Sequence, residues 1–399
     1  MRYSSYINAL SAVILAMVAS SCVKDGIEYE TSNREISIAP VTRSAVKSVP
    51  GPVFGVGLSH EETIGIIADY HPSYEAGEEW DDISEAKAYI RSEFGYVSQY
   101  GAWGGITSYY ENGEKVTKRY HYEWPSEGSL IFAGFSPYYK FDHNDPDNLI
   151  SLRDKYSLSF NRESRTLSIT GYSVGHYVPI TAEQMFDPDY EYQNKTQSDL
   201  MFFMPNVVNG KYIGVNRVNA YPAHFHHALS LIEFTVSAED EYTMDNVDIA
   251  SISLENVYHT GDFSAHVEDD GSITAQWSNL QAAEDVHVLG NSDTNTLGPE
   301  SDEYFYLDMD PRSVAQLLVI PGPTHRVKVV CHVYVQGKIY KQTYLVNPED
   351  VGIDKWEMGK RYVYNLILGI NRISFSPETY EWVDVAGDGA AARDVLNNK

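Results

Sequence analysis

Short runs of alternating apolar and polar residues, separated by Gly, Pro, Asn and Asp, fill most of the chain from residue 53 onward. A period of two places successive side chains on opposite faces of a strand, and β-branched and aromatic residues favour strands. The pattern predicts antiparallel β-sandwiches, with strands at residues 54–58, 118–124, 130–135, 157–160, 167–172, 231–236, 249–254, 315–320, 327–335, 338–345 and 362–369. Helical patterns are few, and one short helix is expected over residues 81–91.

The start of the chain has the pattern of a secretion signal. Residues 1–21 carry one charge, Arg2, and an apolar run too short for the roughly 20 residues of a membrane helix. Small residues then precede Cys22, which resembles the lipobox of bacterial lipoproteins, although Ala19 stands where Leu is usual. We therefore expect a cleaved signal peptide, lipidation at Cys22 and a surface-exposed lipoprotein of the cell outer membrane, with secretion without a lipid as the alternative.

The net charge limits which partners the chain can bind, and the cysteine content limits which cross-links and metal sites it can form. The 399 residues contain 29 Lys and Arg against 56 Asp and Glu, a net charge of −27, and no run of basic residues offsets it. Such a chain repels phosphate backbones, so no nucleic-acid partner is expected. Two cysteines cannot form a disulfide framework or a four-cysteine zinc site. Cys331, in an alternating strand, is interpreted as a core residue, with His332 on the opposite face.

The length predicts two or three domains. Residues 22–52 are polar and rich in Pro, as in a tether, and contain one alternating segment with Ile36, Ile38 and Val41. A polar interval after a buried-looking strand suggests a boundary near residue 206. The expected organisation is a signal peptide at 1–21, a tether with an N-terminal strand at 22–52, β-sandwich domains at 53–206 and 207–382, and a tail at 383–399.

Several short motifs follow one another in an order that resembles one family. They are TRS at 42–44, YEWP at 122–125, LIFAGFSP at 130–137, DLM at 199–201, HALSLIEF at 227–234, LENV at 254–257, GDF at 261–263, LVIP at 318–321 and WEMGKRYVY at 356–364. Together with the lipobox, they make the chain similar to fimbrillins, the exported pilin-like lipoproteins that build type V fimbriae in Bacteroidales. The resemblance covers nearly the whole chain after the signal peptide.

The resemblance implies an all-β fold of two tandem transthyretin-like Greek-key β-sandwich domains with few short helices. It also implies a structural or accessory pilus subunit that acts in cell adhesion and has no enzymatic activity. In that family a protease cuts after an N-terminal arginine, the first strand leaves, and a strand of the next subunit fills the groove. Cleavage would fall between Arg43 and Ser44, and the removed strand would contain Ile36, Ile38 and Val41.

The implied partners are other pilus subunits, surface ligands of host or bacterial cells, and the outer membrane through the lipid anchor. An alternative interpretation of Arg43 is an ordinary exposed loop residue. The tail after residue 382 contains Gly387, Gly389 and three consecutive alanines, a poor composition for a donor strand. The stalk, anchor and tip roles therefore all stay open.

A monomeric glycan-binding lipoprotein is the alternative from another class. Trp80, Trp103, Tyr109 and Tyr110 lie in a stretch expected to be rich in loops, which includes the Gly-rich residues 101–105. Exposed aromatic rings in such loops can stack on sugars. Packing in a core or between strands is the competing interpretation of these four residues.

The sequence motifs give little support for a catalytic site or a metal-binding site. His224 and His226 would share one face of a strand, but no third ligand is identifiable, so a structural role is favoured. The acidic clusters lack the spacing of a calcium loop, and nucleophile-elbow, zinc-protease and phosphate-loop patterns are missing from the sequence. We expect no catalytic residue, metal or cofactor; an exported hydrolase would need carboxylates brought together by folding.

Overall fold

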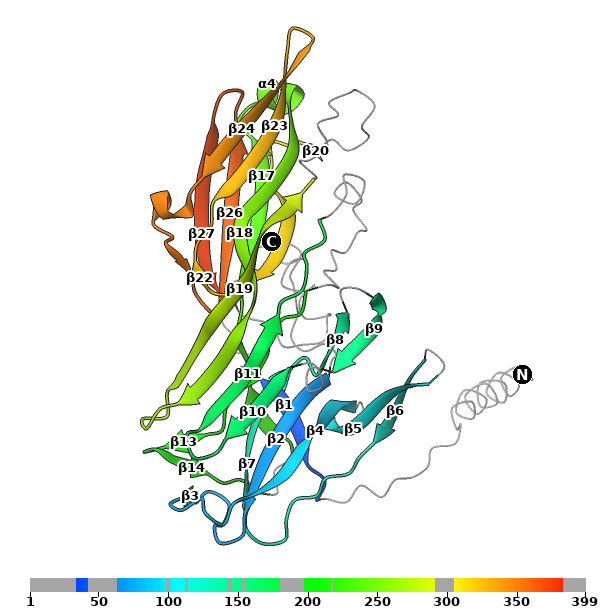
Figure 1. Ribbon diagram of the computed structural model, residues 1–399, viewed down its shortest axis with the longest axis vertical. Coiled ribbons are helices and arrows are strands. Elements are labelled where there is room, and N and C mark those ends of the chain that lie inside the picture. Colours follow the sequence, from blue (N-terminus) through cyan, green and yellow to red (C-terminus); the bar gives the residue numbers. More distant parts are fainter. Residues whose placement is uncertain are drawn as a thin grey trace, which may run out of the picture. The chain divides into compact units, whose positions relative to one another are not determined.

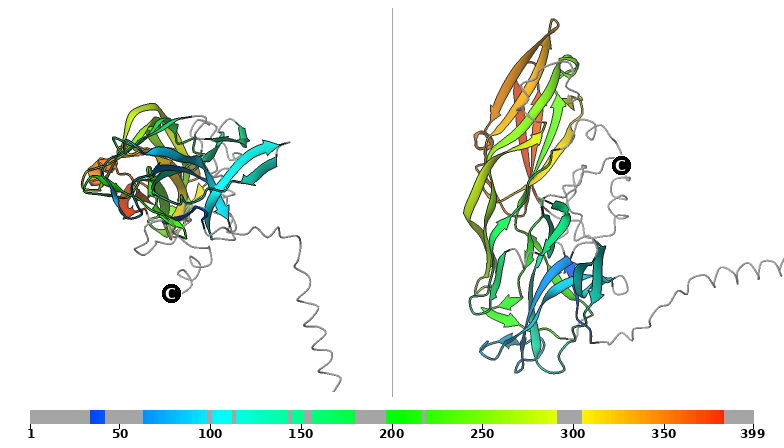
Figure 2. Two further views of the ribbon diagram at one scale, coloured as in Figure 1. Left: turned by 90° about the horizontal axis from the view of Figure 1, so that it is seen from below. Right: turned by 45° about the vertical axis from the view of Figure 1, so that its right-hand side comes forward.

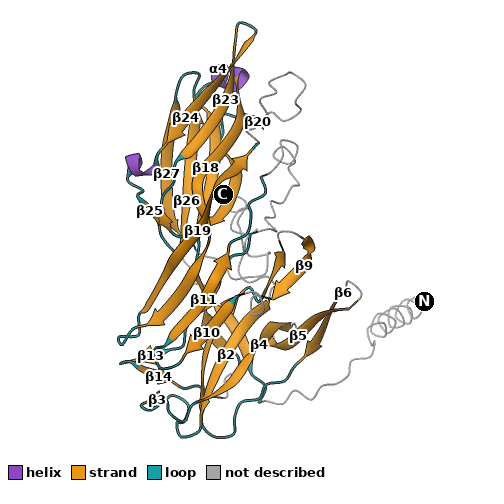
Figure 3. Cartoon of the chain, in the orientation of Figure 1, coloured by secondary structure: helices purple, strands orange, loops and turns teal. Residues whose placement is uncertain are grey.

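The computed structural model describes residues 34–41, 63–97, 101–111, 114–142, 145–151, 156–179, 197–216, 219–290 and 305–382. Strands make up most of these residues, and the single α-helix among them is α4 (Glu241–Asn246) (Figure 3). A 3-10 helix, η1, spans Pro348–Val351. The predicted all-β class is confirmed. Among the residues described, no helix has both the length and the apolar character to cross a membrane.

The largest sheet in the described chain has nine strands and includes the N-terminal strand β1 (Figure 1). β7 is buried along its whole length because its side chains enter separate cores, Leu130 and Phe132 one and Ala133 and Phe135 another, which explains its nearly continuous apolar sequence. In spatial order the strands are β15 (Tyr221–His224), β1 (Ser37–Val41), β5 (Ala102–Glu111), β4 (Lys87–Val97), β2 (Thr63–His71), β7 (Ser129–Ser136), β12 (Met201–Phe203) and β16 (His226–His227), with β6 (Glu114–Arg119) paired to β5.

A second sheet is organised around the long strand β18 (Val247–Val267). Its main path is β10 (Ser157–Asn161), β11 (Thr166–Ser173), β18, β23 (Val327–Val335) and β24 (Lys338–Val346), while β19 (Ile273–Leu289) and β20 (Phe305–Tyr306) also pair with β18. The two residues between β23 and β24, Gln336 and Gly337, have φ values of 50° and 71°. Positive φ at both positions is the geometry of the tight turns that favour hairpins.

The other sheets are smaller. One has the order β21 (Arg312–Val319), β17 (Ser230–Ala238), β26 (Lys360–Leu368) and β27 (Ile373–Glu381). The rest are β13 (Val207–Val208), β14 (Lys211–Ile213) and β3 (Glu79–Trp80); β22 (Gly322–Pro323) and β25 (Lys355–Trp356); and β8 (Tyr139–Asp142) and β9 (Asp145–Ser151).

One hydrophobic core joins the four-stranded sheet to the sheet of β18. Phe234 and Tyr364 come from the first, and Ile249, Val329 and Cys331 come from the second. Two sheets that share one core in this way form a β-sandwich layer pair. A separate core lies against β1 and contains Ile36, Ile38, Phe94, Trp103, Trp124, Leu130, Phe132, Phe203, Tyr221 and Phe225 among others.

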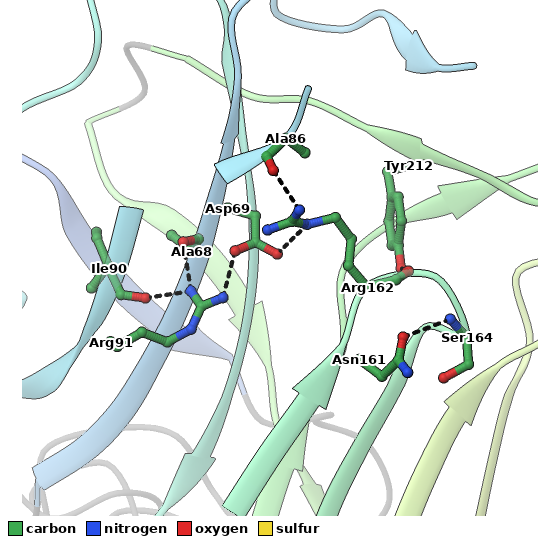
Figure 4. Close-up of polar contacts among 9 residues, drawn as sticks. All are labelled: Ala68, Asp69, Ala86, Ile90, Arg91, Asn161, Arg162, Ser164 and Tyr212. Carbon is green, nitrogen blue, oxygen red and sulfur yellow. Dashed lines mark hydrogen bonds and ion pairs between the residues drawn. The ribbon is translucent and has the colours of Figure 1, made fainter. Parts of the chain in front are cut away.

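A buried carboxylate ties the nine-stranded sheet to the turn between β10 and β11 (Figure 4). Asp69, in β2, accepts from Arg91 Nη2 at 2.5 Å and from Arg162 Nε at 2.8 Å. Arg162 also donates to the carbonyl of Ala86, and its own carbonyl accepts from the Tyr212 hydroxyl. These bonds compensate for the burial of the Asp69 charge, which would otherwise be costly.

The structure differs from two local expectations. The helix predicted over residues 81–91 is wrong, because residues 87–97 form β4, which pairs with β2 on one side and β5 on the other. Residues 101–105, read as a loop, belong mostly to β5. The domain boundary near residue 206 stays a prediction, and β11 and β18, which come from either side of it, are paired.

Candidate functional site

The N-terminal strand β1 lies between two strands that are far from it in sequence (Figures 1 and 2). It runs parallel to β15, with Ile38 opposite Tyr221 and Val41 opposite His224. On its other side it runs antiparallel to β5, where Ile38 faces Trp103. β1 thus pairs on both edges and occupies the slot between β15 and β5.

Three consecutive residues are buried at the start of this strand: Ile36, which directly precedes β1, and Ser37 and Ile38 within it. Ile36 and Ile38 are each 0% exposed and belong to the core of the nine-stranded sheet. Ala39 and Pro40 are half-buried. Burying two isoleucine side chains contributes roughly 3–6 kcal/mol, so β1 supplies a substantial part of this core.

Two hydrogen bonds outside the strand ladder fix the position of β1. The backbone N–H of Ile36 donates to the carbonyl of Tyr122 at 2.7 Å, and the Ser37 hydroxyl donates to the carbonyl of Asn219 at 2.7 Å. Pairing with β5 covers only Ser37 and Ile38. Pro40 lies beyond these two residues. Its missing N–H therefore removes no hydrogen bond to β5.

Aromatic side chains line the slot. The Phe132 and Tyr221 rings have centroids 4.5 Å apart, and Trp124 and Phe132 form a T-shaped pair with centroids 5.7 Å apart. Phe203 packs against Phe225 at 5.0 Å. Burial raises the pKa of Tyr221 to about 12, because the apolar surroundings disfavour the phenolate.

This arrangement has a physical consequence if β1 leaves. β15 and β5 would each present unpaired N–H and C=O groups, and the aromatic core would lose its cover. An exposed sheet edge beside an apolar surface accepts another strand, which satisfies both. Loss of β1 would therefore leave two open strand edges and an uncovered apolar surface.

The two tryptophans considered for glycan contact are buried. Trp80 is 2% exposed and donates from Nε1 to the Ser129 hydroxyl at 2.8 Å, while Trp103 is 7% exposed and packs in the core beside β1. They do not form the exposed platform that the glycan interpretation requires, and the packing interpretation holds for both. Tyr109 and Tyr110 lie in β5, but their side chains are outside the described residues.

The processing and lipidation predictions fall on other parts of the chain. Cys22, Arg43 and Ser44 lie outside the described residues, and for Val41 only the backbone is described. The predictions for these four residues therefore remain predictions.

The histidine segment belongs to the first and last strands in the order of the nine-stranded sheet, with His224 in β15 and His226 and His227 in β16. His227 is buried, its Nδ1 lies 2.6 Å from Asp199 Oδ2, and its ring stacks on Trp382 with centroids 3.7 Å apart. Within the described residues, no three His, Cys, Asp or Glu side chains are placed to hold a metal ion. Cys331 is fully buried, and burial, with a smaller effect of Asp248, raises the pKa of its thiol to about 12. The core interpretation of Cys331 is confirmed.

Sequence reasoning missed the residues that form the slot. β15 begins in the stretch that was read as a polar interval, yet Tyr221, Ala223 and Phe225 alternate with more polar residues and are buried. That period of two was the available signal. Asn219 could not have been identified, because it contributes only its backbone carbonyl.

The fold and this site define a multi-sheet β-protein whose first described strand is inserted between two strands distant in sequence. A family model described as fimbrillin-like matches residues 100–382. The chain belongs to this fimbrillin-like family, as the ordered motifs indicated. A comparison with curated proteins gave no match.

Solved structures similar to this chain include proteins of Bacteroides and Porphyromonas species. A fimbrial protein from Bacteroides vulgatus ATCC 8482 has a TM-score of 0.51 at 15% identity, covering 88% of this chain and 99% of its own. A protein from Bacteroides uniformis ATCC 8492 named for cell adhesion has a TM-score of 0.44 at 12% identity, with 88% and 100% covered. The fimbrial anchor protein Mfa2 from Porphyromonas gingivalis has a TM-score of 0.30 at 10% identity, with 88% and 98% covered. The first of these shares the fold.

Proposed function

We propose that this chain is a structural or accessory subunit of a type V fimbria, acts in cell adhesion, and is assembled by protease-triggered donor-strand exchange. The observation that carries the proposal is the placement of β1 between β15 and β5 with Ile36 and Ile38 fully buried. A strand that covers a core and pairs on both edges leaves an acceptor groove when it is removed.

The sequence around β1 supplies the rest of the mechanism. Arg43 and Ser44 follow β1 by two and three residues, so cleavage between them would separate the strand from the remainder of the chain. A donor strand of another subunit would then run parallel to β15 and antiparallel to β5. It would place apolar side chains at the positions of Ile36 and Ile38 and a small hydroxyl at that of Ser37.

The finer features of the fold and the location belong to the same proposal. The two tandem domains would be transthyretin-like Greek-key sandwiches, at residues 53–206 and 207–382. Cys22 would carry the lipid that tethers the chain to the outer membrane at the cell surface until cleavage, and the partners would be other fimbrial subunits and surface ligands. Family membership supports these assignments.

Limited proteolysis tests the proposal. The chain from residue 23 onward is treated briefly with a protease that cleaves after arginine but not after lysine, and the product is sequenced from its N-terminus and sized. We expect a new N-terminus at Ser44 and a ladder of multimers that resist SDS, because a strand inserted in a fully paired slot dissociates slowly.

Two variants serve as matched controls. Arg43→Ala removes the proposed cleavage site and should give neither the Ser44 terminus nor multimers. Arg34→Ala removes an arginine on the other side of β1 and should behave as the unchanged chain does. A product that begins at Ser44 but stays monomeric would contradict exchange between copies, and cleavage elsewhere would contradict the role of Arg43.

A further inference from the structure

The strand β24 forms an open edge of the sheet built around β18. Its nine residues pair with β23 in continuous register from Lys338 to Val346, without a bulge. In the described part of the chain β24 has no second neighbour, so one row of its backbone N–H and C=O groups faces outward. A long, regular edge is a template for another strand.

Apolar side chains on this strand are exposed. Ile339 is 39% exposed, Tyr340 49% and Leu345 52%. Ile339 and Leu345 lie on one face of β24, whereas Tyr340 shares the other face with Tyr344 and Val346, which pack against the core beneath. Unlike β27, the edge strand of the neighbouring sheet, β24 contains no proline that would interrupt pairing.

The charge of the β23–β24 hairpin is opposite to that of the chain. Residues 327–346 include Lys328, Lys338 and Lys341 but no Asp or Glu, whereas the whole chain has 56 acidic and 29 basic residues. Lys338 and Lys341 are exposed on β24 itself. Lysines on an edge strand oppose pairing with a second copy of the same edge, because like charges would meet. The same charges attract a carboxylate-bearing strand.

We propose that β24 is a docking edge for an extended, acidic polypeptide segment of a partner protein, which adds to the sheet as a further strand. The outward backbone groups select an extended polypeptide rather than a folded surface. Ile339 and Leu345 contact its apolar side chains on one face of the sheet, Lys338 pairs with its carboxylates on the other face, and Lys341 adds electrostatic attraction to the acidic segment. This site is separate from the slot of β1 and goes beyond the proposed function, so either can fail without the other.

A peptide-binding experiment with a charge swap tests the proposal. A fluorescent nine-residue peptide alternating Glu and Val is titrated with the full chain, and anisotropy reports binding. We expect saturable binding that the double variant Lys338→Glu/Lys341→Glu weakens by about tenfold or more. The same variant should gain binding to a peptide alternating Lys and Val.

Two controls separate strand addition from general attraction. The double variant Lys87→Glu/Lys118→Glu makes the same change of charge at exposed lysines of the other sheet and should leave binding unchanged. N-methylation of alternate peptide amides keeps the charge but blocks backbone pairing, and should abolish binding. The proposal is overturned if the Glu peptide fails to bind, if charge reversal at β24 has no effect, or if the N-methylated peptide binds equally well.

Discussion

β1 and β24 are both strands with alternating apolar residues, yet the sheets use them differently. β1 has a neighbour on each edge and buries Ile36 and Ile38 completely, whereas β24 has one described neighbour and exposes Ile339 and Leu345. No charged residue occurs in Ser37–Val41, while β24 carries two lysines. Alternation is therefore common to a covered and an open strand, and in this pair the open-edged strand is the one that carries charges.

Matched alanine substitutions give the largest expected contrast. Ile38→Ala removes buried methyl groups beside Trp103 and should lower the free energy of unfolding by about 2–5 kcal/mol. Ile339→Ala, on the exposed face of β24, should cost no more than about 0.5 kcal/mol. Urea unfolding followed by tryptophan fluorescence measures both, and equal costs would contradict the assigned difference in burial.

The free energy of unfolding should fall at alkaline pH, because the buried phenol of Tyr221 must ionise there. Burial raises the pKa of Tyr221 from 10.0 to about 12. Because the pKa of Tyr221 is higher in the folded than in the unfolded state, the stabilisation by its neutral phenol is complete below pH 10. This stabilisation is lost as the pH rises toward 12. The loss approaches about 3 kcal/mol at the upper end.

Tyr221→Phe isolates this effect from that of other tyrosines. The variant lacks the ionisable hydroxyl, so its stability should fall less steeply between pH 10 and 12 than that of the unchanged chain. Denaturant unfolding at several pH values supplies the comparison. Parallel pH curves for the two proteins would show that Tyr221 does not titrate in a buried slot.

A smaller effect is expected at the polar position of β1. Ser37→Ala removes the hydrogen bond to the Asn219 carbonyl and leaves that acceptor without this donor, at a cost of about 1 kcal/mol. Thr343→Ala on the exposed side of β24 is the matched change and should be close to neutral. The comparison fails if both substitutions shift the urea midpoint equally.

The smallest change in stability should come from the lysines of β24. Lys338→Glu/Lys341→Glu alters only exposed side chains, so unfolding should shift by within about 0.5 kcal/mol. Thermal unfolding checks this directly. A large destabilisation would mean that these lysines stabilise the folded state, rather than acting only in recognition at the open edge of β24.

The local pattern predicted much of the fold but not the pairing of its strands. The alternation of Ile36 and Ile38 indicated a strand, and Val327–Val335 was located with its observed bounds. The neighbours of β1 were not predictable from nearby residues, because β15 lies more than 180 positions away along the chain. Such non-local pairing is decided by the core that the strands share.

The two local errors have related physical causes. The Gly-rich residues 101–105 resembled a loop, yet a Cβ at Gly105 would lie 2.5 Å from the carbonyl oxygen of Tyr120. The glycine permits a close approach to that backbone within a strand. The helix expected over residues 81–91 was overridden because β4 pairs with β2 and β5. Pairing with distant strands outweighed local spacing in both cases.

Hydrogen exchange measured by mass spectrometry, before and after cleavage at Arg43, tests the central claim most directly. If β1 is an exchangeable strand, its release should raise exchange in residues 102–106 of β5 and 221–224 of β15, and assembly into multimers should restore their protection. Unchanged protection of β5 and β15 after the loss of β1 would contradict the account, because the slot would then not depend on the strand that fills it.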